Sequence, residues 1–228
     1  MNETVVSMAF CFPREICFQD GIKTAWYLYG VGTHPASRGK GYARCLIEAC
    51  VSEASAQSVD LCFLIPAEQS LFSYYKRIGF SEVWTNSKTT NQAAETQLRL
   101  ETRPIFECDI ELIDKIYLTA FPASVCRKKS DWELLIEEFR LSSGDGALIY
   151  ENGQLLGYMF FYEKEEMLHI RELALCEDVD AIRVCHAICK VSTWELTRFG
   201  DETPFALAYP LSKDCKIEEN IYCDLLYN

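Results

Sequence analysis

The sequence contains no long hydrophobic run and has an excess of negative charge, and these features exclude several classes of protein. No stretch approaches the ~18 consecutive apolar residues that a membrane-spanning helix needs. The first ten residues include Glu3 and no lysine or arginine, so they lack the basic start of a secretory signal peptide. With 22 Lys and Arg against 34 Asp and Glu, the net charge is −12. Such a chain repels phosphate backbones, so we expect neither a nucleic-acid nor a membrane partner.

The length and composition indicate a globular protein of one or two domains. The 228 residues are about one and a half times the length of a typical domain. With 49% hydrophobic and 25% charged residues, the chain is globular in composition. The charge is uneven: residues 1–104 carry 10 Lys/Arg and 10 Asp/Glu, whereas residues 105–228 carry 12 and 24. The second stretch therefore holds all of the negative charge.

The twelve cysteines lie mostly in apolar surroundings. Cys45 and Cys50 fit a helical pattern and Cys62 fits a strand, so we interpret them as small buried hydrophobic residues in a reducing compartment, which makes a cytoplasmic location the expectation. Cys185-His186-x-x-Cys189 has the spacing of a metal site. No second pair completes four ligands, so we expect core packing there and no metal.

The first half predicts an α/β arrangement with a crossover connection. The expected strands are Val5–Phe12, Ala25–Val31 and Val59–Ile65. One helix is expected to begin at Gly41, and another to cover Leu71–Ile78 and end at Gly79. A loop is expected over Thr33–Gly41.

The second half predicts helices followed by strands. We expect helices over Ile110–Phe121, Asp131–Leu141 and Val179–Arg198, and strands over Ala147–Tyr150, Leu155–Tyr162, Met167–Leu175 and Pro204–Tyr209. Ser130 or Asp131 is the expected N-cap of the second helix. Asn152-Gly153 predicts a tight hairpin turn between the first two strands.

The two halves align with each other, which indicates a duplicated supersecondary unit. When Asn152 is placed on Asn2, the apolar strands that follow run in step, and each is later followed by a helix and another apolar strand. A coincidence of two hairpin-like segments is the alternative. In this alignment the first copy lacks the strand and two helices that precede the Asn-Gly turn of the second copy.

The segment from Arg38 to Ala43 has the composition of a phosphate-binding loop. Gly39 and Gly41 let the backbone approach a ligand closely, and the helix that follows adds a partial positive charge at its start. Arg38 and Lys40 supply full charges. The segment matches neither a Walker loop nor the dinucleotide fingerprint.

Together with its neighbours, this loop resembles the GNAT superfamily of acyl-CoA-dependent N-acyltransferases. The superfamily loop, Arg/Gln-x-x-Gly-x-Gly/Ala, is matched at Arg38, Gly41 and Ala43. Tyr29 to Pro35, which ends Val-x-Thr-His-Pro, resembles the splayed fourth strand, Leu61–Ile65 resembles the fifth, and residues 75–80 match the Tyr-x-x-x-Gly-Phe element that follows. The match covers residues 5–85. The whole chain resembles tandem-domain bacterial members related to the enhanced-intracellular-survival acetyltransferases, without their sterol-carrier-like third domain.

The resemblance implies a role for each site residue. The backbone of Val31 and Thr33 would pair with the pantetheine arm of acetyl-CoA, and the Val31 N–H would donate to the thioester oxygen. Tyr75 would be the general acid for the leaving thiolate, because a phenol with a pKa of ~10 is protonated at neutral pH. Tyr74 is its rival, with a spacing to Gly79 that is off by one. The pyrophosphate would be held by the amides of Arg38, Gly39, Lys40, Gly41, Tyr42 and Ala43.

The general base cannot be read from the sequence. The acceptor, a small-molecule or peptide amine, must lose a proton before it attacks. His34 lies beside Pro35 and fits a structural role better than that of a base, and Glu68 lies at a helix start where acidic residues are common. The acceptor's identity and the oligomeric state, a homo-oligomer included, are left open.

The predicted architecture is therefore α/β (α+β), with two tandem GNAT-like mixed-sheet modules. Residues 1–104 form the catalytic module without its first strand and helices, either because the gene model is truncated or because Ile110–Phe121 and Asp131–Leu141 complete the site. Residues 105–228 form a degenerate module, because Glu177-Asp178-Val179-Asp180 stands where the first has its basic glycine loop. If the acidic module faces the acceptor channel, its field would attract cationic amines over a Debye length of ~8–10 Å.

Three functions from different classes follow from this interpretation. The first is an N-acetyltransferase that moves an acetyl group from acetyl-CoA to a primary amine by direct attack in a ternary complex. The second is a CoA-binding module that has lost catalysis. The third is an interaction protein on a relic of the fold.

Overall fold

In the residues that the structure describes, the fold combines eleven strands with five helices and short 3-10 turns. The structure is a computed structural model that describes residues 4–18, 20–176, 179–200, 202–212, 215, 217 and 220–223. The strands are β1 (Ser7–Phe18), β2 (Gly21–Thr33), β3 (Leu61–Leu64), β4 (Glu82–Gln92), β5 (Leu100–Pro104), β6 (Ser124–Val125), β7 (Gly144–Glu151), β8 (Gln154–Lys164), β9 (Met167–Leu175), β10 (Thr193–Phe199) and β11 (Thr203–Pro210). The helices are α1 (Tyr42–Ala56), α2 (Phe72–Lys76), α3 (Ile110–Ala120), α4 (Lys129–Leu141) and α5 (Ala181–Ile188), and the 3-10 turns are η1 (Pro35–Ser37), η2 (Gln69–Leu71) and η3 (Glu107–Asp109).

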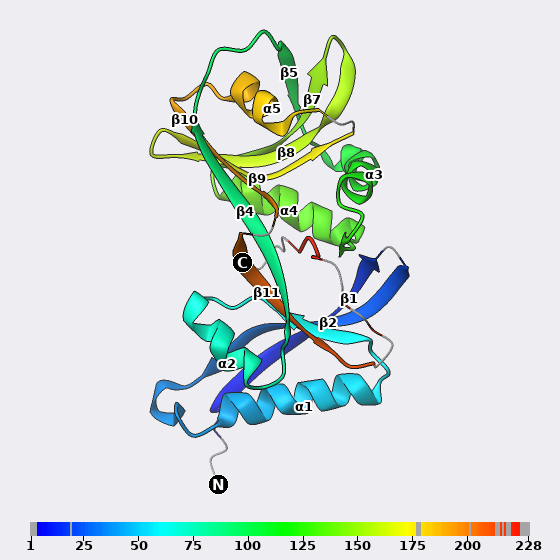
Figure 1. Ribbon diagram of the computed structural model, residues 1–228, viewed down its shortest axis with the longest axis vertical. Coiled ribbons are helices and arrows are strands. Elements are labelled where there is room, and N and C mark those ends of the chain that lie inside the picture. The colour runs from blue at the N-terminus through cyan, green and yellow to red at the C-terminus, as the bar shows by residue number, and fades with distance from the viewer. Residues whose placement is uncertain are drawn as a thin grey trace.

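The molecule is elongated, with two lobes stacked along its long axis (Figure 1). The lower lobe contains β1, β2, α1, β3 and α2, and the upper lobe contains β5, β7 to β10 and α3 to α5. One mixed sheet runs through both, in the order β5-β7-β8-β9-β10-β4-β11-β3-β2-β1-β6. The fold class is thus a mixed α/β sheet, as the sequence predicts.

Each lobe contains the same parallel crossover. In the lower lobe β2 and β3 are parallel and joined through α1, and in the upper lobe β9 and β10 are parallel and joined through α5. The connection between parallel strands through a helix is the arrangement that the alternating pattern predicts. The hairpin turn at Asn152 and Gly153 is also present between β7 and β8, with Asn152 at a φ of +50°.

The two lobes share the strands at the centre of the sheet. β11 lies between β3 and β4 and is antiparallel to both, and β4 continues upward to pair with β10 (Figure 1). The lower lobe is therefore completed by a strand from the second half of the chain, and the upper lobe by one from the first. The division into modules at residue 104 stays a prediction.

The predicted helix over Val179–Arg198 is wrong in its second half. The helix α5 ends at Ile188, where Cys189 adopts an extended backbone, and residues 193–199 form β10. Trp194 and Leu196 are almost fully buried and alternate with more exposed neighbours, which is the period of a strand. β10 therefore takes the place that the alignment of the halves gave to Pro204–Tyr209.

The helix α4 begins at Lys129, two residues before its predicted start at Asp131. Lys128 is the N-cap, and neither Ser130 nor Asp131 takes that position. Asp131 instead lies in the first turn, where its carboxylate accepts a hydrogen bond of 2.8 Å from the Lys128 backbone N–H. Ser130 precedes it within the helix. An aspartate therefore does mark the start of this helix, but Asp131 takes the N3 position of the capping box and is not the N-cap.

The two faces of the lower lobe are covered in different ways. The helices α1 and α2 cover one face, where Leu28, Ile47 and Phe80 belong to one core cluster. The opposite face corresponds to the one that α3 and α4 cover in the upper lobe. In the lower lobe it is covered by residues from the second half, among them Val125 and Ile221. In the described part of the chain, no helix is long and apolar enough to cross a membrane.

Candidate active site

The site lies where β2 and β3 separate. The two strands pair only from Ala25 with Leu61 to Tyr27 with Phe63, whereas β2 continues to Thr33. β2 also bulges against β1 after Tyr29, where Gly30 has a φ of +61°. A Cβ atom at Gly30 would lie 3.2 Å from the Phe10 ring, so the bulge favours glycine for both its conformation and its space.

The separation leaves a cavity of about 490 Å³, which we call the reaction cavity. It is lined by Tyr27, Leu28, Tyr29, Gly30, Val31, Leu64, Ile65, Pro66, Ala67, Leu71, Tyr75 and Phe205. The structure thus brings the predicted Val31 and Tyr75 to one cavity. Phe205 was not predicted, because β11 reaches this site only through the exchange of strands, and no local sequence signal marks such a residue.

Tyr75 is held in place by the turn that follows α2. Its backbone carbonyl accepts hydrogen bonds from the amides of Ile78, Gly79 and Phe80, and its ring meets the Phe80 ring edge-on. The side chain is 8% exposed. Burial, and to a smaller extent Tyr74, raises the pKa of Tyr75 above its ordinary value. The phenol therefore keeps its proton at neutral pH and can donate it.

Tyr74, the rival of Tyr75, lies outside the reaction cavity. Its ring packs edge-on against Tyr75 at 5.2 Å between centroids, and it is not among the cavity's lining residues. Burial also raises the pKa of Tyr74. The geometry thus favours Tyr75 as the proton donor to a group in this cavity.

The predicted phosphate loop stands at the exposed start of α1. Gly39 and Gly41 have φ values of +75° and +83°, and a Cβ atom at either position would meet nothing within 4 Å. Gly41 is the N-cap of α1 and offers no side chain to the first-turn amides. The amides from Gly39 to Ala43 make none of the backbone hydrogen bonds found among the described residues. This is the open, positively polarised arrangement that binds anions.

Arg38 braces this loop from the side of β2. Its Nε donates to the Thr33 carbonyl over 3.2 Å, and its backbone N–H donates to the Pro35 carbonyl over 3.3 Å. The Arg38 amide is therefore satisfied within the loop, unlike the amides that follow it. Lys40 and Tyr42 are both exposed beside the glycines. Thr33 is fixed in turn by a 3.1 Å contact between its hydroxyl and that of Ser7.

The corresponding helix start in the upper lobe is already capped. Asp180 is the N-cap of α5, and its carboxylate accepts a 2.9 Å hydrogen bond from the Ile182 amide. A carboxylate at this position repels an anion and occupies a donor that the anion would need. Glu177 and Asp178, which the sequence prediction also invoked, lie outside the described residues.

Neither candidate base lies in the reaction cavity. His34 is exposed at the start of η1, and Glu68 accepts a hydrogen bond from the Ser70 hydroxyl at the start of η2. Among the described residues that line the cavity, none has a carboxylate or an imidazole side chain.

The metal-like spacing in α5 serves the core. Cys185 is fully buried, and the His186 ring accepts hydrogen bonds from the Trp194 indole and the Ala94 amide at 3.2 Å each. Among the described residues, no group of three or more His, Cys, Asp and Glu side chains could hold a metal ion.

Comparisons with known proteins point to one fold. Residues 1–83 match the family model described as an acetyltransferase (GNAT) domain. A probable N-acyltransferase from Enterococcus faecalis has a TM-score of 0.76 and 16% identity over 93% of this chain and 60% of its own. A GCN5-related N-acetyltransferase from Anabaena variabilis has a TM-score of 0.69 and 16% identity over 90% of this chain and 59% of its own. Eis1 from Mycobacterium abscessus has a TM-score of 0.67 and 11% identity over 93% of this chain and 63% of its own.

These comparisons bear on the fold and on part of each relative. At such low identity the solved structures establish a shared fold, and the chain spans about 60% of the length of the first of them. A search of curated proteins finds no match.

Proposed function

We infer from the match of residues 1–83 that the chain belongs to the GNAT superfamily, and we propose that it transfers an acetyl group from acetyl-CoA to a primary amine by direct attack in a ternary complex. The single observation that carries the proposal is the meeting of Val31 and Tyr75 in one cavity at the separation of β2 and β3. The open loop from Gly39 to Ala43 supports it, because it offers an anion site at the exposed end of the same strand and helix unit.

Each part of the substrate has a candidate partner. The pyrophosphate would accept hydrogen bonds from the amides between Gly39 and Ala43, with Lys40 and Arg38 adding positive charge. The pantetheine arm would lie along the stretch of β2 beyond Tyr27, which β3 leaves unpaired. This arrangement would bring the thioester to Val31 and Tyr75.

The reaction needs charge stabilisation and two proton movements. As the amine attacks the thioester carbon, negative charge grows on the oxygen, and the Val31 N–H would donate to it. When the C–S bond breaks, Tyr75 would give its proton to the leaving thiolate. The attacking amine must also lose a proton, and no lining carboxylate or imidazole is placed to take it, so a water chain is the proposed route.

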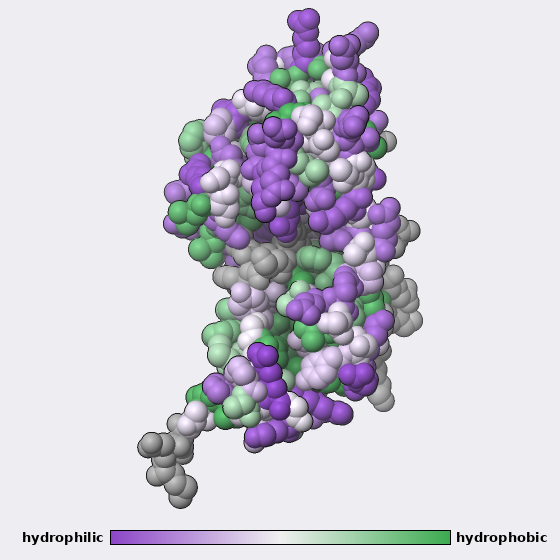
Figure 2. All heavy atoms as spheres, turned by 90° about the vertical axis from the view of Figure 1, so that its left-hand side faces the viewer, coloured by the Kyte–Doolittle hydropathy of each residue, from purple (hydrophilic) through white to green (hydrophobic). Residues whose placement is uncertain are grey.

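The acceptor is proposed to be a small-molecule or peptide amine. The negative charge of residues 105–228 supports attraction of an ammonium group towards the protein. In Figure 2 hydrophilic residues cover most of the upper lobe, whereas hydrophobic ones are more evident on the lower lobe.

The buried thiols of Cys62 and Cys185, whose pKa values burial raises to about 12, fit a reducing cytoplasm.

Replacement of Tyr75 tests the role of the acid. We expect Tyr75→Phe to lower kcat about a hundredfold or more, the usual contribution of general acid catalysis, while the Kd for acetyl-CoA from calorimetry stays nearly the same. Tyr74→Phe is the matched control and should leave both quantities close to those of the wild type. If affinity collapses while turnover per bound complex is unchanged, Tyr75 is not the acid.

A CoA-binding protein without catalysis is the second candidate. It is favoured by the lining of the reaction cavity, which holds no carboxylate or imidazole to serve as a base. A CoA-release assay over a panel of amines separates the two. Tight acetyl-CoA binding without release on any amine supports the binding module, and the absence of heat on titration with acetyl-CoA would leave only an interaction protein.

A further inference from the structure

A second cavity lies between the two lobes, beside the reaction cavity. This inter-lobe cavity has a volume of about 280 Å³. Part of its lining comes from the exchanged strands, with Asn86 and Lys88 on β4 and Thr203 on β11, and Glu195 and Thr197 on β10 add to it. The exchange of β4 and β11 therefore contributes to both sides of the cavity. None of the residues from Arg38 to Ala43 lines it, so it lies apart from the proposed cofactor loop.

The two cavities meet at Phe205. This side chain lines both of them. It lies at a bulge of β11, where the pairing with β4 shifts between Pro204 and Ala206. Bulges re-aim a side chain next to functional sites. Gln69 also lines the inter-lobe cavity and holds β11 beside Phe205, because its side-chain amide donates to the Pro204 carbonyl over 2.8 Å.

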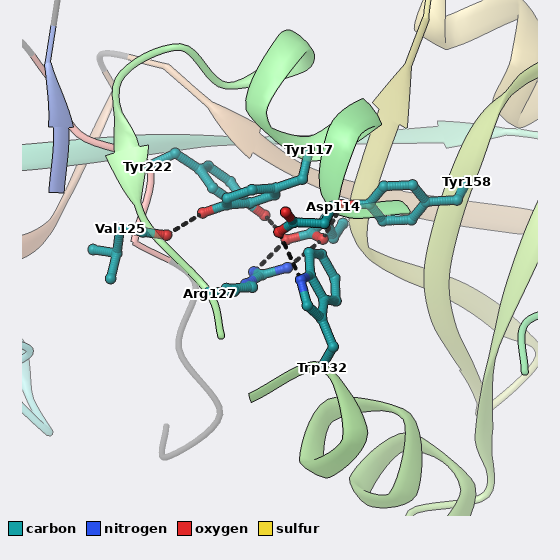
Figure 3. A network of polar contacts seen from close by, with 8 residues as sticks. Asp114, Tyr117, Val125, Arg127, Trp132, Tyr158 and Tyr222 are labelled. Atoms are coloured by element: carbon teal, nitrogen blue, oxygen red, sulfur yellow. Dashed lines mark hydrogen bonds and ion pairs between the residues drawn. The ribbon is translucent and has the colours of Figure 1, made fainter. Parts of the chain in front are cut away.

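The far wall of the inter-lobe cavity is anchored by a buried network (Figure 3). Tyr222 lines the cavity and its hydroxyl donates to Glu172 over 2.8 Å. Glu172 also binds Arg127 and accepts a hydrogen bond from Tyr158. The ion pair between Arg127 and Glu172 thus fixes the position of Tyr222 and, with it, this part of the cavity wall.

The charged groups of the cavity are largely committed to each other. Lys88 Nζ lies 3.2 Å from Glu195 Oε1, and His169 Nδ1 lies 3.5 Å from the same oxygen. Burial alone would raise the pKa of Glu195, but Lys88 and His169 lower it below its ordinary value. Because the Glu195 carboxylate is already engaged, it is not open to a further positive charge. The hydroxyls of Thr197 and Thr203 and the amide of Asn86 suit hydroxyl or amide groups.

We propose that the inter-lobe cavity binds the distal part of the acceptor, an uncharged tail bearing hydroxyl or amide groups, and that Phe205 is the specificity-determining residue across which this tail lies. The inference rests on the proposed function and deepens it. The amine would sit in the reaction cavity, the body of the acceptor would pack on the Phe205 ring, and the tail would bond to the lining of the inter-lobe cavity.

The test compares acceptors that differ in length and tail charge. Glycinamide is the short probe, and glycyl-seryl-serinamide is the long one, since three extended residues span about 10 Å. A linear triamine of similar length has a cationic tail. In the wild type we expect kcat/KM for the long peptide amide to exceed that for glycinamide about tenfold or more, with no such gain for the triamine.

Two variants and a control locate the effect. Thr197→Trp should fill the inter-lobe cavity and abolish the advantage of the long amide without changing turnover of glycinamide. Phe205→Ala should reduce the same ratio by removal of the packing surface. Thr102→Trp, at an exposed position on β5, is the matched control and should change nothing. Thermal melts of each variant check that the fold is kept.

A binding measurement separates this inference from the proposed function. Glycyl-seryl-serinamide is titrated by calorimetry into wild-type and Thr197→Trp protein saturated with CoA. Binding that Thr197→Trp weakens, without turnover of any amine, supports the cavity and overturns the acetyltransferase. Turnover or binding of the long amide that is unaffected by both Thr197→Trp and Phe205→Ala overturns the cavity's role and leaves the acetyltransferase standing.

Discussion

The Arg127–Glu172 pair is the most deeply buried ion pair among the described residues. Their side chains are 6% and 3% exposed, and the guanidinium binds the carboxylate through two hydrogen bonds of 2.7 Å and 2.6 Å. The guanidinium also lies over the rings of Tyr117 and Trp132, 4.3 Å and 4.5 Å from their centroids (Figure 3). Burial alone would lower the pKa of Arg127, but Glu172 raises it well above its ordinary value. The guanidinium of Arg127 is therefore charged in the folded protein.

Loss of Arg127 should destabilise the fold strongly. Arg127→Leu leaves the Glu172 carboxylate buried without its cation, and breaking a buried pair in this way costs about 3–5 kcal/mol. The measurement is the free energy of unfolding by urea. The control is Arg44→Ala, which removes an exposed pair with Glu48 and should change stability by less than about 1 kcal/mol. Equal losses from the two variants would contradict the role assigned to the buried pair.

At the scale of single residues, the sequence predicted what lies close together along the chain. The loop from Arg38 to Ala43 and the Tyr75 motif were found because their chemistry is local, and the structure brings Val31 and Tyr75 to one cavity. Phe205 could not be predicted, because Ala67 and Leu71, which line the same cavity, are distant in the chain and are brought near it by the order of the strands.

At the scale of elements, the packing of β11 depends on the glycine of the Tyr-x-x-x-Gly-Phe element. Gly79 follows α2 with a φ of +123°, and a Cβ atom there would lie 2.5 Å from the Tyr209 ring on β11. The Phe80 ring also meets Tyr209 edge-on, at 5.5 Å between centroids. The Tyr-x-x-x-Gly-Phe element therefore packs against the exchanged strand as well as ending the helix.

Gly79→Ala should loosen this packing. The substitution forces a side chain into a backbone conformation that costs about 1–2 kcal/mol for other residues, and it also displaces the Tyr209 ring. We expect a lower melting temperature and a lower kcat, because the Tyr75 backbone carbonyl accepts a hydrogen bond from the Gly79 amide and Tyr75 is the proposed acid. Gly39→Ala also has a positive φ but meets nothing within 4 Å, so it controls for the backbone cost alone. A Gly79→Ala variant no less stable than Gly39→Ala would show that the Tyr209 contact contributes nothing.

The type of an element could be predicted where one hydrophobic period continues through the whole element. The prediction failed where the period changes from that of a helix to that of a strand. α3 and β9 agree with the sequence because their apolar residues keep one period throughout. The sequence predicts a helix after Ile188 because Trp194 and Leu196 continue the apolar pattern of the helical residues before them. In the structure they alternate as in a strand. β4 was missed, because its residues Thr85 to Asn91 are mostly polar and are ordered by pairing with β10 and β11.

At the scale of the whole molecule, the exchange of β4 and β11 makes each lobe depend on the other. β11 contributes Ala206, Leu207 and Ala208, all fully buried, to the sheet of the lower lobe. Val125 and Ile221 from the second half cover one face of that sheet. The sequence could not reveal this, because pairing between distant strands leaves no mark on local periodicity.

Separation of the two predicted modules should therefore abolish folding of the first. A fragment of residues 1–104 lacks β11, so β3 and β4 lose the strand that joins them, and the cluster around Tyr27, Phe63 and Trp84 is exposed. We expect it to aggregate, or to be digested by protease at least tenfold faster than the whole chain. Coexpression with residues 105–228 is the control and should restore a protease-resistant complex, because it supplies the missing strand. A fragment 1–104 that melts cooperatively on its own, and that binds acetyl-CoA as the whole chain does, would show instead that the exchange of strands adds little to the stability of the site.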